Sequence, residues 1–195
     1  MKMLDRLVIL LFALVILMGC AQTPRKTAFN NGVYKFTDLV TMNPANVRVA
    51  VRLDSRAAVK KGQFFIGALL LSKQWPWARF TAPLKVVRKG RQVLPGTAPA
   101  PKGETWYLME PTAEGITGLQ RAQDEIKFHQ GRYDEFRVTV MFRKFEHLPQ
   151  GLEEHFPVKI LLRFPPRKNF RTVFDGYRNL QREQNKDLAV WNHAF

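Results

Sequence analysis

The sequence predicts a mainly β protein, a β-sandwich-like domain of about seven or eight strands with one amphipathic helix. Apolar and polar residues alternate in several short segments, which is typical of half-buried strands. Prolines and glycines separate these segments, and a single segment has the apolar spacing of a helix. This order of elements favours a sandwich with a helical crossover. A mixed α+β sheet with the helix on one face is the alternative.

Three strands are expected in the first half of the domain. Residues 47–54 alternate between an apolar set and a partly basic set, which indicates a half-buried strand. The continuous apolar run FFIGALLL at 64–71 predicts a central strand that is covered on both faces. Residues 80–86 alternate again, and Pro83 indicates an edge or bulged strand because proline cannot donate to a sheet ladder.

The middle of the chain contains a loop, a short strand and the helix. The segment LPGTAPAPKG at 94–103 is rich in proline and glycine and is expected to be a loop. A short strand follows at 106–109. Apolar residues then recur at helical spacing, so we expect an amphipathic helix at about 113–130, with Thr112 as N-cap and Gly131 where the helix stops.

Two clear strands, at 136–142 and 156–164, follow the helix, and residues 170–174 predict a last short one. Beyond this point the chain becomes polar. The expected organisation is a leader at 1–19, a tether at 20–31, a β-rich domain at 32–177 and a polar C-terminal tail at 178–195.

The first twenty residues have the layout of an export signal. Lys2 and Arg6 precede a run of twelve apolar residues, LVILLFALVILM, at 7–18. As a helix this run would be about 18 Å long, too short for a hydrocarbon core of about 30 Å. A short apolar segment behind a basic start is typical of a signal peptide and not of a transmembrane anchor. The segment ends in Leu17-Met18-Gly19-Cys20.

This ending resembles the lipobox of bacterial lipoproteins, with Leu17 three residues before the cysteine and the small Gly19 directly before it. The resemblance implies that Cys20, the only cysteine in the chain, carries the lipid anchor, including palmitate-type acyl chains. Several acyl chains give stable membrane anchoring. Neither Ala21 nor Gln22 is the aspartate that marks inner-membrane retention. The resemblance therefore implies the outer membrane of a bacterial cell envelope, with the domain facing the periplasm.

Composition predicts a folded domain with an unusual charge. Of the 195 residues, 46% are hydrophobic and 24% are charged, which is typical of a globular protein and argues against a disordered one. Lys and Arg number 31 against 16 acidic residues, a formal net charge of +15. Such a field attracts anionic surfaces. For an exported protein we expect phospholipid, lipopolysaccharide or an acidic protein to be the partner, and not nucleic acid.

A basic sheet face is the strongest candidate for binding. In three predicted strands the cations lie on the side opposite the apolar residues, and Ala50 shares that side in the first of them. The candidate residues for an anionic partner are Arg48, Arg52, Arg137, Arg143, Lys159 and Arg163. If these strands are neighbours, the six cations share one surface. A charged, solvated sheet face without a ligand is the alternative.

An aromatic turn is the second candidate. Trp75 and Trp77 flank Pro76, which stiffens the turn that displays them. Their rings are candidates for contact with a partner, a glycan or the bilayer interface. Trp106 and Tyr107 belong to the same aromatic candidate, and packing in the core is the alternative for at least one tryptophan.

Residues with catalytic chemistry are few. The two serines, Ser55 and Ser72, lie outside any G-x-S-x-G turn, and no phosphate loop, C-x-x-C or H-E-x-x-H motif is present. We therefore expect no catalytic residues and no cofactor. His147 and His155, which flank an acidic loop, are weak candidates for a metal site, although their spacing is wider than usual.

Together these features predict a non-enzymatic binding or scaffold module, anchored to the membrane through lipid, with another envelope protein or an anionic envelope component as its partner. An envelope hydrolase or metal-binding protein that uses the loop of His147 and His155 is the alternative.

Overall fold

The computed structural model describes residues 36–129, 131–143, 145, 148, 151–152, 155–165 and 168–178. The predicted signal peptide, Cys20, the tether and all of the predicted tail beyond residue 178 lie outside these residues. The elements in chain order are α2 (Phe36–Thr41), η1 (Pro44–Asn46), β1 (Arg48–Asp54), β2 (Phe64–Leu71), β3 (Ala78–Gly90), β4 (Glu104–Pro111), α3 (Ala113–Phe128), β5 (Glu135–Phe142), β6 (Phe156–Arg163) and β7 (Arg171–Arg178).

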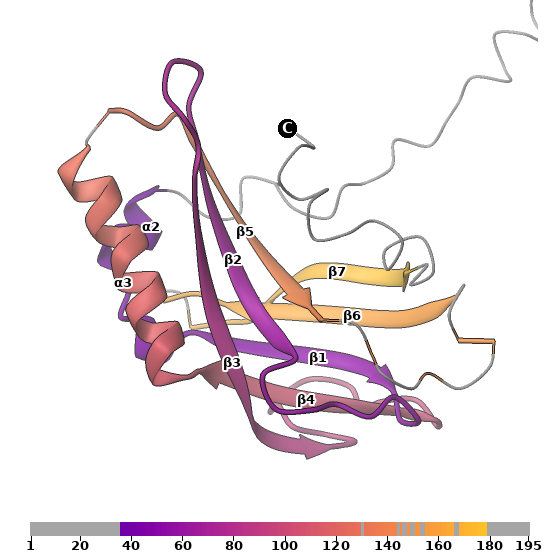
Figure 1. Cartoon of the computed structure of the whole chain (residues 1–195). Coiled ribbons are helices and arrows are strands. Elements are labelled where there is room, and N and C mark those ends of the chain that lie inside the picture. Colours follow the sequence, from indigo (N-terminus) through magenta and orange to yellow (C-terminus); the bar gives the residue numbers. More distant parts are fainter. Residues whose placement is uncertain are drawn as a thin grey trace, which may run out of the picture.

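Within the described residues, seven antiparallel strands and one long helix confirm the mainly β prediction. The strands form one sheet in the order β5-β2-β3-β4-β1-β6-β7. This sheet is curled into a half-barrel, so that its two arms enclose a common core as two separate layers would (Figure 1). None of the helices in the described ranges is long and apolar enough to cross a membrane.

The strand β3 forms the corner between the two arms. Its first half pairs with β2, where Pro83 lies opposite Phe65. Its second half pairs with β4, starting with Leu84 opposite Pro111. The proline therefore lies at the position where the strand changes its partner. A register shift around Val87 adds the bulge that the sequence indicated.

The main core lies inside the curl. The alternating apolar residues of β1 and β6 point into it, and Val49, Val51, Ile160 and Leu162 are almost completely buried there. From the other arm, β2 contributes residues to the same core and is buried along most of its length. The alternation in the sequence thus predicted which side of β1 and β6 faces the main core.

The helix α3 begins where the sequence predicted and ends two residues earlier. The Thr112 side chain accepts a hydrogen bond from the Gly115 backbone N–H at 3.1 Å, which makes it the N-cap. Two glycines allow the helix to approach β3 closely. A Cβ atom on Gly118 would lie 2.1 Å from the Thr81 carbonyl oxygen, and one on Gly115 would lie 2.4 Å from that of Pro83. Close packing against β3 therefore explains why the helix contains two glycines, although glycine disfavours a helix.

The short helix α2 was not predicted from the sequence. It packs against α3 through Gln123, which is 6% exposed. The Gln123 side-chain amide donates to the carbonyl oxygens of Leu39, at 2.7 Å, and Met42, at 2.8 Å. These carbonyls lie near the end of α2, where helical hydrogen-bond partners run out. One side chain thus fixes the start of the described domain to the helix.

The proline-rich loop covers part of the outer face of the sheet. Leu94 and Ala100 from this loop, with Val93 directly before it, form a second small core with residues of the strands, among them Trp106. Ala50, which the alternation assigned to the basic face, is completely buried in it. The centre of this face is therefore apolar and covered, because the loop folds back on it.

Candidate functional site: a basic sheet face and its open edge

Four of the six candidate cations come together on the outer face of β1 and β6. Arg48 lies directly opposite Arg163, and Arg52 lies directly opposite Lys159. In an antiparallel pair, residues directly opposite each other point to the same face. These four cations flank the apolar centre formed by Ala50 and its neighbours.

The other two candidates, Arg137 and Arg143, lie elsewhere. Arg137 is on β5 and Arg143 directly follows it. Three strands separate β5 from β1 in the sheet. The structure therefore does not bring all six cations to one surface. The backbone of Arg143 also pairs with that of Gln63, through a hydrogen bond of 2.8 Å.

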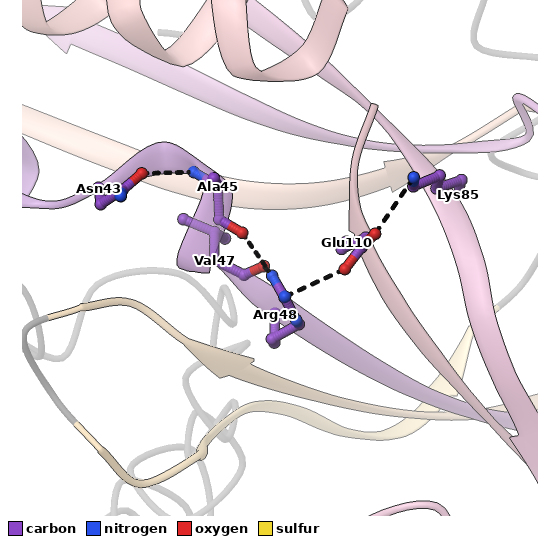
Figure 2. A network of polar contacts seen from close by, with 6 residues as sticks. All are labelled: Asn43, Ala45, Val47, Arg48, Lys85 and Glu110. Atoms are coloured by element: carbon purple, nitrogen blue, oxygen red, sulfur yellow. Dashed lines mark hydrogen bonds and ion pairs between the residues drawn. The ribbon is translucent and has the colours of Figure 1, made fainter. Parts of the chain in front are cut away.

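Arg48 is held in a network of polar contacts that includes residues of four elements (Figure 2). Its guanidinium donates to the carbonyl oxygens of Ala45, at 2.6 Å, and Val47, at 2.8 Å. It also forms an ion pair of 3.0 Å with Glu110, which pairs with Lys85 at 3.2 Å. Arg48 thus ties η1 and β1 to β4 and β3, and much of its bonding capacity is used within the protein.

The remaining cations of this face also have partners, either on neighbouring strands or, for Arg163, directly before β7. Arg52 forms an ion pair with Glu104, and its guanidinium lies 5.6 Å from the centre of the Trp106 ring. Lys159 pairs with Asp175. The Arg163 guanidinium lies 5.5 Å from the centre of the Phe170 ring. Acidic residues of β4 and β7 therefore offset much of the positive charge on this face.

The second half of β3 is a basic site that sequence reasoning missed. Among the described strands, only β4 pairs with residues 84–90, so the other edge of this segment is open. Side chains along it are exposed, including Val86 and Val87, which are 43% and 46% exposed. Cations flank these valines at Lys85, Arg88 and Lys89. The signal in the sequence was the run KVVRKGR at 85–91.

Neighbouring residues shift the pKa values of Asp54 and Tyr133, which lie outside this edge. The pKa of Asp54 is lowered, chiefly because its carboxylate accepts hydrogen bonds from the Arg56 side chain at 2.8 and 3.0 Å. The pKa of Tyr133 is raised, first by burial and then by the 2.5 Å hydrogen bond that its hydroxyl donates to Glu125. Both shifts belong to local pairs that hold loops in place.

The aromatic turn between β2 and β3 is exposed. Trp75 and Trp77 are 50% and 42% exposed, whereas Trp106 is buried. The tryptophans of the turn are therefore available for contact, and the packing alternative applies to Trp106.

The predicted metal-site loop lies largely outside the described residues, and so does His147. His155 is exposed, and its ring centre lies 6.3 Å from that of Tyr177. Within the residues that the structure describes, no group of three or more His, Cys, Asp or Glu side chains could hold a metal ion.

Comparison with known proteins gives no relative from which a site could be assigned. No protein-family model matches the chain, and no curated protein and no solved structure is significantly similar to it. Both the class of the protein and its role are therefore argued from its own residues.

Proposed function

We propose that this protein is a lipid-anchored lipoprotein of the bacterial cell envelope, placed in the outer membrane and facing the periplasm. The observation that carries this proposal is Leu17-Met18-Gly19-Cys20 directly after a twelve-residue apolar run and a basic start. The segment from Ala21 to Asn31 is mainly polar and suits a tether between lipid and domain.

The domain acts as a non-enzymatic binding module, and the open edge of β3 is its binding site. An exposed strand edge offers backbone N–H and C=O groups that an extended peptide can pair with. Arg88 and Lys89 give this edge a positive charge that attracts an acidic segment and repels a basic one, whereas the charge of Lys85 is offset by its ion pair with Glu110. Exposed Val86 and Val87 add apolar contact area between these cations. The partner is therefore an envelope protein with an extended acidic segment.

The basic sheet face of β1 and β6 is less suited to binding than the open edge of β3. Three of its four cations, Arg48, Arg52 and Lys159, form ion pairs with Glu110, Glu104 and Asp175, so binding there would require breaking these ion pairs. Lys85 connects the two surfaces, because it lies on the open strand and pairs with Glu110.

Cross-linking from living cells tests the binding site. A photo-reactive residue at Val87 is expected to give one cross-linked product, and the double variant R88E/K89E is expected to reduce its yield severalfold. The matched control is R121E/R171E, which reverses two exposed cations on α3 and β7 and should leave the yield unchanged.

Mass spectrometry of the product then identifies the partner. A peptide rich in Asp and Glu supports the proposal. A product that contains lipopolysaccharide would show that the partner is an anionic glycolipid and not a protein. No product, or a product that R88E/K89E leaves unchanged, contradicts binding at this edge.

A further inference from the structure

The turn between β2 and β3 projects at one end of the molecule (Figure 1). Residues 73–77 of this turn are all exposed, and Trp75 and Trp77 are among the most exposed large apolar side chains of the described residues. Phe128, the last residue of α3, is 84% exposed, and α3 ends at the same end of the molecule. Three large aromatic side chains are therefore exposed to solvent on the turn and at the end of α3.

Hydrogen bonds within the turn, and others from the connection between α3 and β5, hold the turn in a defined conformation. The Ser72 hydroxyl accepts hydrogen bonds from the backbone N–H groups of Gln74, at 3.1 Å, and Trp75, at 3.2 Å. The Lys73 N–H donates to the Asp134 carboxylate at 2.9 Å, and the Asp134 N–H donates to the Leu71 carbonyl oxygen at 2.8 Å. A fixed turn loses less conformational freedom on binding than a flexible one.

Arg132 adds a stacking contact to this arrangement. Its guanidinium lies 4.3 Å from the centre of the Trp75 ring, a distance typical of a cation–π contact. The indole is therefore supported by a cation while half of its surface remains exposed.

The charges around the rings favour an anionic surface. Lys73, Lys127 and Arg132 lie on the segments that carry or support the rings. Of the nearby carboxylates, those of Glu125 and Asp134 are engaged within the protein, whereas Asp124, four residues before Phe128 on α3, is exposed. Glu125 accepts from the Tyr133 hydroxyl and lies 3.7 Å from His129 and 4.0 Å from Arg132, and Asp134 accepts from the turn.

We propose that this aromatic tip, formed by Trp75, Trp77 and Phe128, inserts into the headgroup region of a bilayer that contains anionic phospholipid. Tryptophan is favoured at membrane interfaces because its ring is apolar and its N–H can remain hydrated. Each Lys or Arg close to an anionic bilayer strengthens attachment by about fivefold. A projecting tip suits a flat surface, and Phe128 adds apolar area that offers no hydrogen bond to a glycan.

This inference rests on the proposed lipid anchor. Fifteen residues separate Cys20 from Phe36, and a chain of that length spans at most about 50 Å. The anchor therefore keeps the tip close to the bilayer, and a weak interaction is sufficient to hold it there.

Fluorescence quenching by brominated lipid tests the proposal on the full lipidated protein. The protein is reconstituted into vesicles that contain phosphatidylglycerol with brominated acyl chains, and its tryptophan emission is compared with that in unbrominated vesicles. Insertion of the tip predicts strong quenching, and the variant W75F/W77F should reduce the quenched emission by about twofold or more. Y177A removes an exposed aromatic side chain of β7 and should leave the quenching unchanged.

The lipid composition provides a second comparison. Replacement of phosphatidylglycerol by phosphatidylcholine is expected to lower the quenching, and so is the variant K73Q/K127Q in anionic vesicles. Equal quenching in both lipids would contradict the role of the cations.

The experiment distinguishes a tip that does not insert into the bilayer from a protein that carries no lipid anchor. If the protein floats with the vesicles but W75F/W77F does not change the quenched emission, the tip does not insert and the anchor stands. If the protein does not float with the vesicles and carries no acyl chain, the anchor is wrong and this inference is overturned with it.

Discussion

Gln123 is a buried polar side chain that provides hydrogen-bond donors for two backbone carbonyls at the end of α2. A buried carbonyl without a donor costs about 1–3 kcal/mol. The side chain thus links α2 to α3. These hydrogen bonds explain why a polar residue is buried here, and no ligand is needed to explain it. Arg48 is a similar case, because its guanidinium bonds two carbonyls and a carboxylate.

Replacement of Gln123 by methionine keeps the approximate volume and removes both donors. We expect the free energy of unfolding to fall by about 1–3 kcal/mol, measured by chemical denaturation. Q120M changes an exposed glutamine of the same helix and should stay within about 0.5 kcal/mol of the parent. Equal stability of Q123M and Q120M would contradict the role of these hydrogen bonds.

Asp54 makes the stability depend on pH. Its pKa is lower in the folded protein than in the unfolded chain, because Arg56 donates to its carboxylate. Its contribution is therefore fully present above the unfolded pKa and is lost as the pH falls through the folded pKa. We expect this loss below about pH 4.

Thermal unfolding between neutral and acid pH measures this contribution. The variant D54N should show a smaller decrease in Tm on acidification than the parent, and R56Q should behave in the same way because it removes the donor. Identical acid dependence in the parent and both variants would refute the assignment.

At the scale of elements, α3 and β3 are fitted to each other by the glycines at 115 and 118. On an exposed helix, replacement of glycine by alanine stabilises by about 1 kcal/mol. At Gly118 the added methyl group would lie 2.1 Å from a backbone oxygen, which cannot move without shifting β3.

The variant G118A is therefore expected to destabilise the protein, by about 1–3 kcal/mol, opposite to the effect of helix propensity. T117A, at an exposed position of the same helix, serves as the control and should have little effect. The measurement is the free energy of unfolding of the three proteins. A G118A variant that is more stable than the parent would contradict the close contact between α3 and Thr81.

The elements could be predicted from the sequence far better than their arrangement. Alternation and helical spacing depend on neighbouring residues in the chain, so the strands and α3 were found close to their observed positions. The partner of a strand depends on the whole fold. For this reason the sequence did not reveal that Glu110 lies beside Arg48, or that β5 lies far from β1 in the sheet.

The open edge of β3 was hidden for the same reason. Its basic run was visible in the sequence, but its exposure follows from the change of partner at Pro83. The aromatic turn was easier to identify, because Trp-Pro-Trp between two strands already suggested display. The stacking of Arg132 on Trp75, by contrast, could be recognised only from the structure.

At the scale of the whole molecule, the half-barrel has one core inside its curl and a smaller one outside it. The loop between β3 and β4 closes the smaller core over Ala50 and Trp106. A segment with the composition of a linker is thus part of the packed domain.

Truncation of Leu94, which is 5% exposed, tests this role of the loop. We expect L94A to lower the free energy of unfolding by about 2–5 kcal/mol, as for other buried leucines. P95A, at the exposed neighbouring position, should cost much less. If the loop only connects two strands, L94A will have as little effect as P95A.

The two proposed surfaces lie at opposite ends of β3, which has the aromatic turn before it and the basic edge along its second half (Figure 1). Thirteen strand residues span about 40 Å. A tip in the bilayer would therefore present the basic edge to the periplasm, at a distance from the membrane where a partner protein can reach it.

The anchor is the premise on which this arrangement depends, and intact-mass analysis of the amino-terminal peptide from membranes tests it most directly. We predict a mature chain that begins at Cys20, with a mass increase that corresponds to diacylglycerol and an amide-linked acyl chain, and no such peptide from the variant C20S. An unmodified Cys20, or a chain that is cleaved at another position, would contradict the account.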